Sequence, residues 1–214
     1  MLAANHTMLV SNTEYKKLAS EDQVQSIAKV LEVNGMKTVI VENGEEAKKF
    51  VLDLVPQGVE IYVGQSQTLE KLGLGVEFDQ SGRYDAVRPK VFAMDRKTRG
   101  DEIRKLRASP DYFIGSVQAI TEMGQVLISS FGGSQLGAYA YGSAKVIWVV
   151  GTQKLVKDLD EGLRRIEEYC YPLEDARLHA AFGIHSANAK TLIVNREVVP
   201  GRITIVLVKE ELGY

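Results

Sequence analysis

Apolar residues recur along the chain at two different spacings, and the spacing changes from one block to the next. Val24, Ile27 and Leu31 lie three and four residues apart, which predicts an amphipathic helix over residues 14–33. A β-branched run at residues 38–41 predicts a strand, and the acidic start of segment 45–55 suits a helix N-terminus. These segments together form a first strand–loop–helix unit.

The same order of elements returns further along the chain. Apolar runs predict strands at residues 59–63, 112–117 and 144–150, and helical patterns follow at 64–74, 101–108 and 155–170. Two further β runs, 191–194 and 203–208, flank the turn signal Pro200-Gly201 and are expected to pair or to extend the sheet. The alternation predicts an α/β fold with a mainly parallel sheet flanked by helices.

Some segments carry a weaker pattern. Residues 77–90 are polar with little periodicity, and we expect a lid or an irregular connection there. No linker divides the 214 residues, so we expect an N-terminal helical segment over 1–36 and one α/β domain over 37–214.

Composition and charge exclude several functional classes. The apolar share of 45% and the charged share of 25% are those of an ordinary globular domain. A net charge of -2 gives no excess that would favour nucleic acid or an anionic membrane as a partner. The start of the chain has no basic segment followed by a long apolar run, so a cytoplasmic location is expected.

The cysteine and the histidines predict no metal site. Cys170 is the only cysteine and falls on the apolar stripe of the last long helix, which indicates a buried side chain. His6, His179 and His185 lack the spacing of metal ligands and are expected to be capping or surface residues. We therefore expect no metal and no bound cofactor in this chain.

The first candidate binding site follows the strand at 59–63. Gly64, Gln65, Ser66 and Thr68 form a small polar loop before a helix, where exposed N–H groups and the helix N-terminus favour an anion. The alternative is that Ser66 or Thr68 only caps the helix.

The second candidate lies in the segment ITEMGQVLISSFGGSQLG, residues 120–137. Thr121, Glu122 and Gly124 predict a tight turn between two strands, where the acid is either a solvent-exposed turn residue or a catalytic carboxylate. One strand later a glycine-rich loop supplies Gly132, Gly133, Ser134 and Gln135. We expect this loop and Glu122 to approach each other across one site.

Three segments together resemble the LUD family, the lactate utilization proteins of the LutC/YkgG type, formerly the DUF162 domain of unknown function. They are QAITEMGQVLIS at 118–129, KVIWVVGTQKLVKDLDEGLRRI at 145–166 and the ending RITIVLVKEELGY. The resemblance implies the NagB/RpiA/CoA transferase-like fold of ribose-5-phosphate isomerase, glucosamine-6-phosphate deaminase and CoA transferases. It implies ligand binding by the Gly64–Thr68 loop, and a catalytic role for Glu122, which matches the glutamate of the CoA transferases.

The sequence departs from the family pattern in three places. Gln118 stands where relatives usually have Asn, and the loop ending in Gln135 lacks an Arg that would bind anions through its guanidinium fork. The segment 183–190 lacks the cysteine cluster of many relatives. Any iron–sulfur role is therefore excluded for this chain and is expected of partner proteins.

Three functional hypotheses follow. The first is a LUD-type subunit that binds a small anionic ligand and acts with iron–sulfur partner proteins in L-lactate oxidation to pyruvate. The second is an independent CoA transferase-like or sugar-phosphate isomerase-like enzyme that uses Glu122. The third is a non-catalytic binding module. Homo-oligomers are compatible with all three.

Overall fold

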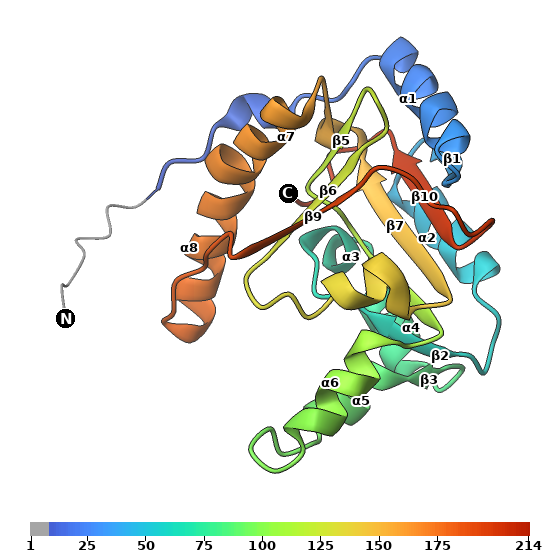
Figure 1. Ribbon diagram of the computed structural model, residues 1–214, viewed down its shortest axis with the longest axis vertical. Helices are drawn as coiled ribbons and strands as arrows, with labels where there is room; N and C mark the ends of the chain where they lie inside the picture. The colour runs from blue at the N-terminus through green and yellow to red at the C-terminus, as the bar shows by residue number, and fades with distance from the viewer. Residues whose placement is uncertain (1–8) are drawn as a thin grey trace.

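The computed structural model describes residues 9–214 and is built around a parallel sheet of six strands (Figure 1). All neighbouring strands in this sheet run parallel. Their order is β1 (Lys37–Val41), β10 (Ile203–Val208), β7 (Lys145–Gly151), β4 (Tyr112–Gly115), β2 (Glu60–Val63) and β3 (Asp85–Ala86). The predicted α/β class with a mainly parallel sheet is confirmed.

Alternation along the central strands sends side chains into two separate cores. In β7, Val146, Trp148 and Val150 face one core, and Ile147 and Val149 face the other. The second core is covered by α2 (Gly44–Leu54), α3 (Gln67–Lys71) and α4 (Leu74–Gln80). Helices α1 (Glu21–Val33), α5 (Val87–Phe92) and α6 (Gly100–Ala108) pack on the first core.

A second, smaller sheet completes the first core. Its strands, in order, are β8 (Leu155–Val156), β5 (Ala119–Thr121), β6 (Val126–Ser130) and β9 (Lys190–Val194). β5 and β6 form an antiparallel hairpin, and β9 pairs antiparallel with β6. Ile120, Val126 and Ile128 point into the first core, while Ala119 and Leu127 pack under the helical column.

The helical column consists of α7 (Leu159–Arg165), the π-helical turn η4 (Ile166–Cys170) and α8 (Tyr171–Phe182), which follow each other without a break. It stands beside the small sheet, away from α1 (Figure 1). Shorter turns are η1 (Thr13–Lys16), η2 (Ala138–Gly142) and η3 (Thr152–Lys154). The part of the chain that the structure describes contains no helix long and apolar enough to cross a bilayer.

Several predicted elements were wrong in position. The first long helix begins at Glu21, not at residue 14, because Ser20 and Gln23 form a capping box. The helix predicted at 64–74 is interrupted by Gly73, whose φ of 66° starts α4 as a separate helix. Leu155 lies in β8, so the following helix starts only at Leu159.

The expectation for residues 77–90 was also wrong, because this segment is neither a lid nor irregular. It contains the end of α4, the short strand β3 and the start of α5, whose Val87 is buried. The last two β runs do not pair with each other, since β9 joins the small sheet and β10 lies between β1 and β7. The boundary predicted at residue 36 stays a prediction, and residues 1–8, with His6, lie outside the described residues.

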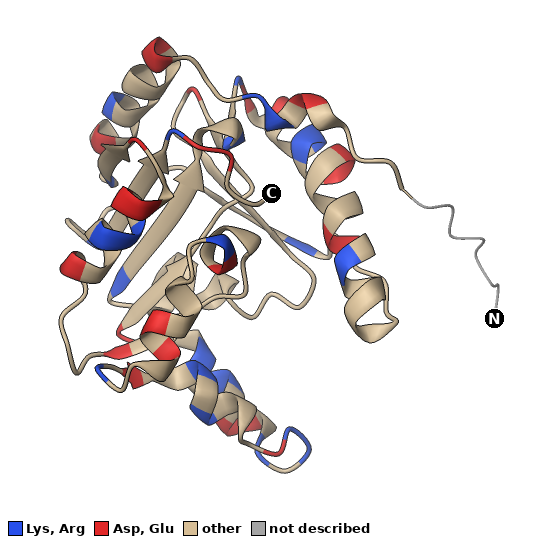
Figure 2. Cartoon of the chain, turned by 180° about the vertical axis from the view of Figure 1, so that it is seen from behind, with Lys and Arg blue, Asp and Glu red and all other residues tan. Residues whose placement is uncertain are grey.

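Charge is distributed by layer. Figure 2 shows most Lys, Arg, Asp and Glu residues on the helices and connecting loops, while the strands of the main sheet are almost free of them. The buried strand β7, for example, has one charged residue, Lys145, at its exposed start. A charged side chain buried next to this sheet therefore calls for a specific explanation.

Candidate functional site

A cavity of about 290 Å³ lies at the carboxyl ends of β2 and β4. Gly64, Gln65 and Ser66 follow β2, and Ser116 follows β4; all four line it. Ligands of open parallel sheets bind at this end of the strands. The cavity is therefore at the position where the fold favours a ligand site.

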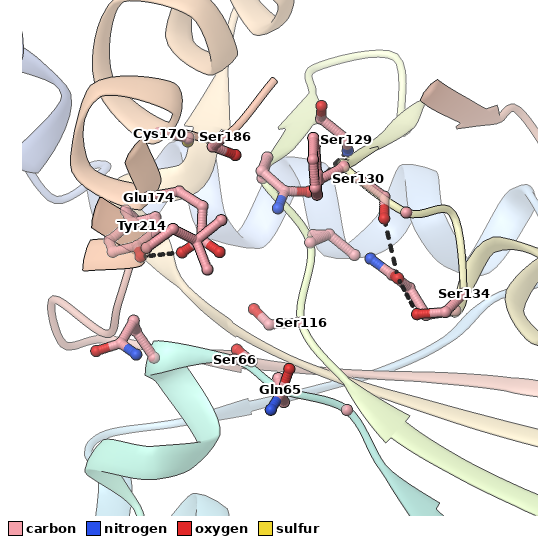
Figure 3. Close-up of a pocket in the computed structure, with 18 of the residues that line it drawn as sticks. Gln65, Ser66, Ser116, Ser129, Ser130, Ser134, Cys170, Glu174, Ser186 and Tyr214 are labelled. Atoms are coloured by element: carbon pink, nitrogen blue, oxygen red, sulfur yellow. Dashed lines mark hydrogen bonds between the residues drawn. The ribbon is translucent and has the colours of Figure 1, made fainter. Parts of the chain in front are cut away.

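The other walls come from segments that are distant in sequence. Ser129, Ser130 and the loop after β6 form one wall, and the start of α8 together with Tyr214 forms the opposite one. Figure 3 shows Ser134 on the first side, Glu174 and Tyr214 on the second, and Ser116 between them. Most labelled groups are hydroxyls or amides, so the lining is polar and uncharged over much of its surface.

A lysine lies directly beneath this lining. Lys154, in the turn after β7, is fully buried, and its Nζ donates hydrogen bonds to Thr68 Oγ1 at 2.9 Å, Ser116 Oγ at 3.0 Å and the Tyr214 carbonyl oxygen at 3.1 Å. Three acceptors match the three protons of an ammonium group. Burial, followed by the positive charge of Arg165, lowers the pKa of Lys154 to about 7.

An arginine is buried beside this lysine. The side chain of Arg165, from α7, is fully buried, and its Nη1 donates to the carbonyl oxygen of Gln118 and to Cys170 Sγ, the latter at 3.0 Å. Within residues 9–214 its Nε and Nη2 have no hydrogen-bond partner. The thiol of Cys170 lines the cavity, and burial raises its pKa.

No Asp or Glu side chain of the described residues forms an ion pair with Lys154 or Arg165. Besides the two hydroxyls, the acceptor of Lys154 Nζ is the main-chain oxygen of Tyr214, the last residue of the sequence. Burial of an unpaired charge costs on the order of several kcal/mol of folding free energy. Such an arrangement is expected where a ligand supplies the missing negative charge.

The carboxylate that does face the cavity from α8 is already engaged. Glu174 accepts two hydrogen bonds from Arg177, both at 2.8 Å, and one from the phenol of Tyr214 at 2.6 Å. The hydrogen bonds that Arg177 donates to Glu174 raise the pKa of Arg177, and burial raises the pKa of Tyr214. Glu174 therefore does not neutralise Lys154 or Arg165.

Six of the predicted site residues meet in this cavity. Gly64, Gln65 and Ser66 come from the loop after β2, and the other three, Gly132, Ser134 and Gln135, come from the loop after β6. The structure thus brings these two loops together, whereas the sequence analysis expected the glycine-rich loop to face Glu122. Ligand binding by these residues stays a prediction.

The remaining predicted residues lie outside the lining. Thr68 is buried beneath it, where its hydroxyl donates to the Leu212 carbonyl and accepts from Lys154. Gly133 has a φ of 77°, and its N–H donates to Ser130 Oγ. Thr121 and Gly124 belong to the hairpin turn, where the Thr121 hydroxyl accepts from the N–H of Gln125.

Glu122 is exposed in the same turn, and the expectation that it faces the glycine-rich loop was wrong. The turn is at one end of β6 and the loop at the other, and five strand residues separate them by roughly 17 Å. The turn packs instead on α1, where Asn34 Nδ2 donates to the Met123 carbonyl. A catalytic role of Glu122 gains no support from this position.

The sequence analysis missed Lys154, Arg165, Ser116, Glu174 and Tyr214. Lys154 had one usable signal, because it closely follows a predicted buried strand, at the end where ligands bind. Arg165 is adjacent to the apolar stripe that contains Ile166, so its burial could have been suspected. Glu174 and Tyr214 gave no local signal, since only the folded chain brings them together.

The comparisons with known proteins agree with this architecture. The family model of the LUD domain matches residues 24–208. The chain belongs to the LUD domain family. The crystal structure of a DUF162 family protein from Deinococcus radiodurans is similar, with a TM-score of 0.55 over 90% of this chain and 99% of that one, at 14% identity. No curated protein matched the chain.

Two of the three departures that the sequence analysis noted, Gln118 and Gln135, have structural roles. Gln118 Oε1 accepts a hydrogen bond from the N–H of Ser129, and Gln135 Oε1 accepts from the hydroxyl of Ser130. Both amides thus fix the end of β6 and the loop that follows it. The LUD family is associated with lactate utilization. The cavity is the feature of this chain to which a function can be related.

Proposed function

We propose that this LUD domain is a cytoplasmic lactate utilization subunit that binds a small anionic ligand in the cavity between the Gly64 and Gly132 loops. The observation that supports the proposal is the buried pair Lys154 and Arg165, which has no Asp or Glu partner within residues 9–214. A bound carboxylate would supply the negative charge that the protein leaves out. Ser116, which contacts Lys154 and lines the cavity, would be within reach of the same ligand.

The electron-transfer part of lactate oxidation would take place on partner proteins. An iron–sulfur cluster needs several cysteine thiolates, whereas this chain has one cysteine, and that one is buried. The subunit would therefore bind or present the acid, and iron–sulfur proteins would carry the electrons.

Calorimetric titration tests the ligand part of the proposal. L-lactate and pyruvate are titrated at pH 6.5, and lactamide, which has the shape of lactate without its charge, is the ligand control. We expect heat from the acids and none from lactamide. In Lys154→Met the affinity falls by at least about tenfold, since the variant removes the positive charge beneath Ser116 that attracts the acid; tenfold corresponds to about 1.4 kcal/mol.

A matched variant separates a loss of charge from a general effect of removing a lysine. Lys29 is exposed on α1, so Lys29→Met should bind the acids as the parent protein does. Equal binding of lactate and lactamide, or unchanged binding by folded Lys154→Met, would refute the proposal. The fold of each variant is checked by circular dichroism.

A further inference from the structure

A third cation reaches the cavity from the side opposite Tyr214. Arg107, in the last turn of α6, lines the cavity, and its Nη2 donates a hydrogen bond to Ser134 Oγ at 2.8 Å. Its guanidinium carbon lies 5.4 Å from the ring centroid of Tyr62, which also lines the cavity. Packing on this ring holds the guanidinium in place at the wall.

This guanidinium is not saturated by the protein. Nε of Arg107 is buried without a hydrogen-bond partner, and no carboxylate in the described part of the chain forms an ion pair with it. Other arginines on the same end of the molecule behave differently: Arg99 pairs with Glu102, and Arg104 pairs with Asp101. Figure 2 shows many Lys, Arg, Asp and Glu residues on the helical end formed by α5 and α6. Of Arg99, Arg104 and Arg107, only Arg107 lines the cavity.

The cavity therefore has positive charge at two separate places. Lys154 and Arg165 lie under Ser116, Cys170 and Tyr214, and Arg107 lies behind Ser134. Figure 3 shows Tyr214 and Ser134 on opposite sides of the hollow, with Ser116 between them. The two positive places therefore belong to different walls of the cavity.

The volume of the cavity also favours a ligand larger than a three-carbon acid. About 290 Å³ is close to the roughly 300 Å³ at which pockets begin to accept drug-sized molecules, so a three-carbon acid would leave much of the cavity to water. The hydroxyls of Ser66, Ser129 and Ser130 also line the cavity. Those of Ser129 and Ser130 already donate to Asn188 and Gln135, so Ser66 is the one of the three that can donate to a longer ligand.

We infer that the ligand is a small organic dianion, with one anionic group over Lys154 and a second on the guanidinium of Arg107. This inference rests on the proposed function, because it takes Lys154 as the first anion site. Arg107 adds the specificity: it distinguishes a molecule that is acidic at both ends from a monocarboxylate such as lactate.

The test compares dicarboxylates with monocarboxylates of the same length by calorimetric titration. The probes are succinate, glutarate and adipate, matched with butyrate, pentanoate and hexanoate, so that the span between the two anion sites need not be known in advance. 3-Phosphonopropionate replaces one carboxylate by a phosphonate. We expect at least one dianion to bind roughly 10- to 100-fold more tightly than its monoanionic match.

Variants assign the second group to Arg107. In Arg107→Gln the advantage of the dianion should disappear, while the affinity for the monoanion stays the same. Arg104→Gln removes a guanidinium from the same helix that is largely exposed and bound to Asp101, and it should leave both affinities unchanged. Both positions are partly or fully exposed, so these variants are expected to fold.

The two levels of the argument fail in different ways. If monoanions bind through Lys154 but no dianion binds more tightly, or Arg107→Gln keeps the advantage, the dianion inference is wrong and the proposed function stands. If no acid of either kind binds, both are wrong. If the phosphonate is the tightest ligand and depends on Arg107, the inference holds and the second group is phosphate-like.

Discussion

At the scale of single residues, Lys154 is the most informative side chain. It is fully buried beside Arg165, and burial together with that arginine lowers its pKa to about 7. In the unfolded chain a lysine titrates near about 10.4. Below pH 7 Lys154 is protonated in both states, but its charge is much less favourable in the folded protein than in the unfolded chain. This difference lowers the free energy of unfolding.

Removal of this charge should stabilise the ligand-free protein. Between pH 7 and about 10.4 the unfolded state binds more protons than the folded state, so the contribution of Lys154 to stability rises with pH. Lys154→Met lacks this dependence. We expect it to exceed the parent by a few kcal/mol at pH 6, on the order of magnitude of the pKa shift, with a difference that narrows toward pH 10. Urea denaturation at a series of pH values measures it.

Lys29→Met is the control for this measurement, because Lys29 is exposed. Its stability relative to the parent should not vary with pH over the same range. A constant difference between Lys154→Met and the parent from pH 6 to pH 10 would mean that Lys154 is not the titrating group.

We predict different effects on ligand binding for substitutions of Glu122 and Glu174. Glu122→Gln changes an exposed turn carboxylate away from the cavity, so acid binding should be unchanged within error. Glu174→Gln removes the charge that holds Arg177 and the Tyr214 phenol in the wall, so affinity should change measurably. Calorimetric titration of both variants measures these affinities. A strong effect of Glu122→Gln alone would contradict the prediction and would show that the hairpin turn is part of the site.

Local sequence was enough to find two loops that line the cavity, but not the charged groups of the site. Gly64 and Ser66 were predictable because a small polar loop follows a recognisable strand. Lys154 is hydrogen-bonded to Ser116, 38 residues away in sequence, and to Tyr214, 60 residues away. Contacts of this kind depend on strand order, which hydrophobic periodicity does not contain.

At the scale of elements, the end of β4 shows how packing shapes the cavity. Gly115 is the last residue of the strand, and a Cβ there would lie 1.6 Å from the hydroxyl of Tyr139. Tyr139 is buried in η2 and lines the cavity. Glycine is therefore required for this ring to lie against the strand.

Gly115→Ala should displace Tyr139 and reshape the cavity. Overpacking of this kind costs typically about 1–3 kcal/mol, and we expect a loss of that size in chemical denaturation together with weaker acid binding. Gly137→Ala is the matched control, because a Cβ at Gly137 meets nothing within 4 Å. Parent-like stability and binding of Gly115→Ala would show that the ring has room to move.

The predictability of the elements followed their length and pattern. Strand β7 and helix α2 were predicted almost at their observed bounds, because each carries a strong periodic pattern with clear end signals. The small sheet was not predicted as a separate layer. Its strand β8 has only two residues, and β9 pairs with β6 across a long stretch of sequence, so no local pattern reveals either pairing.

At the scale of the whole molecule, the cavity is suited to ligand binding, whereas the single buried cysteine is not suited to holding an iron–sulfur cluster. Cys170 has its thiol against Arg165 inside the fold, so it is not accessible as a ligand for an external cluster. Within residues 9–214 no group of three side chains could hold a metal ion. In the proposed lactate-oxidising system, the clusters would therefore be held by other chains.

We predict that the tagged protein, purified without air from its own cells grown on L-lactate, co-elutes with iron–sulfur proteins. The expected readout is iron and acid-labile sulfide in the eluate, together with partner chains that mass spectrometry shows to be rich in cysteine. The same purification from glucose-grown cells controls for nonspecific capture. Lys154→Met should retain these partners, because Lys154 lies inside the cavity floor and not on the surface. Recovery of the chain without iron from lactate-grown cells would contradict the partnership, while the anion-binding experiments would remain an independent test of the cavity.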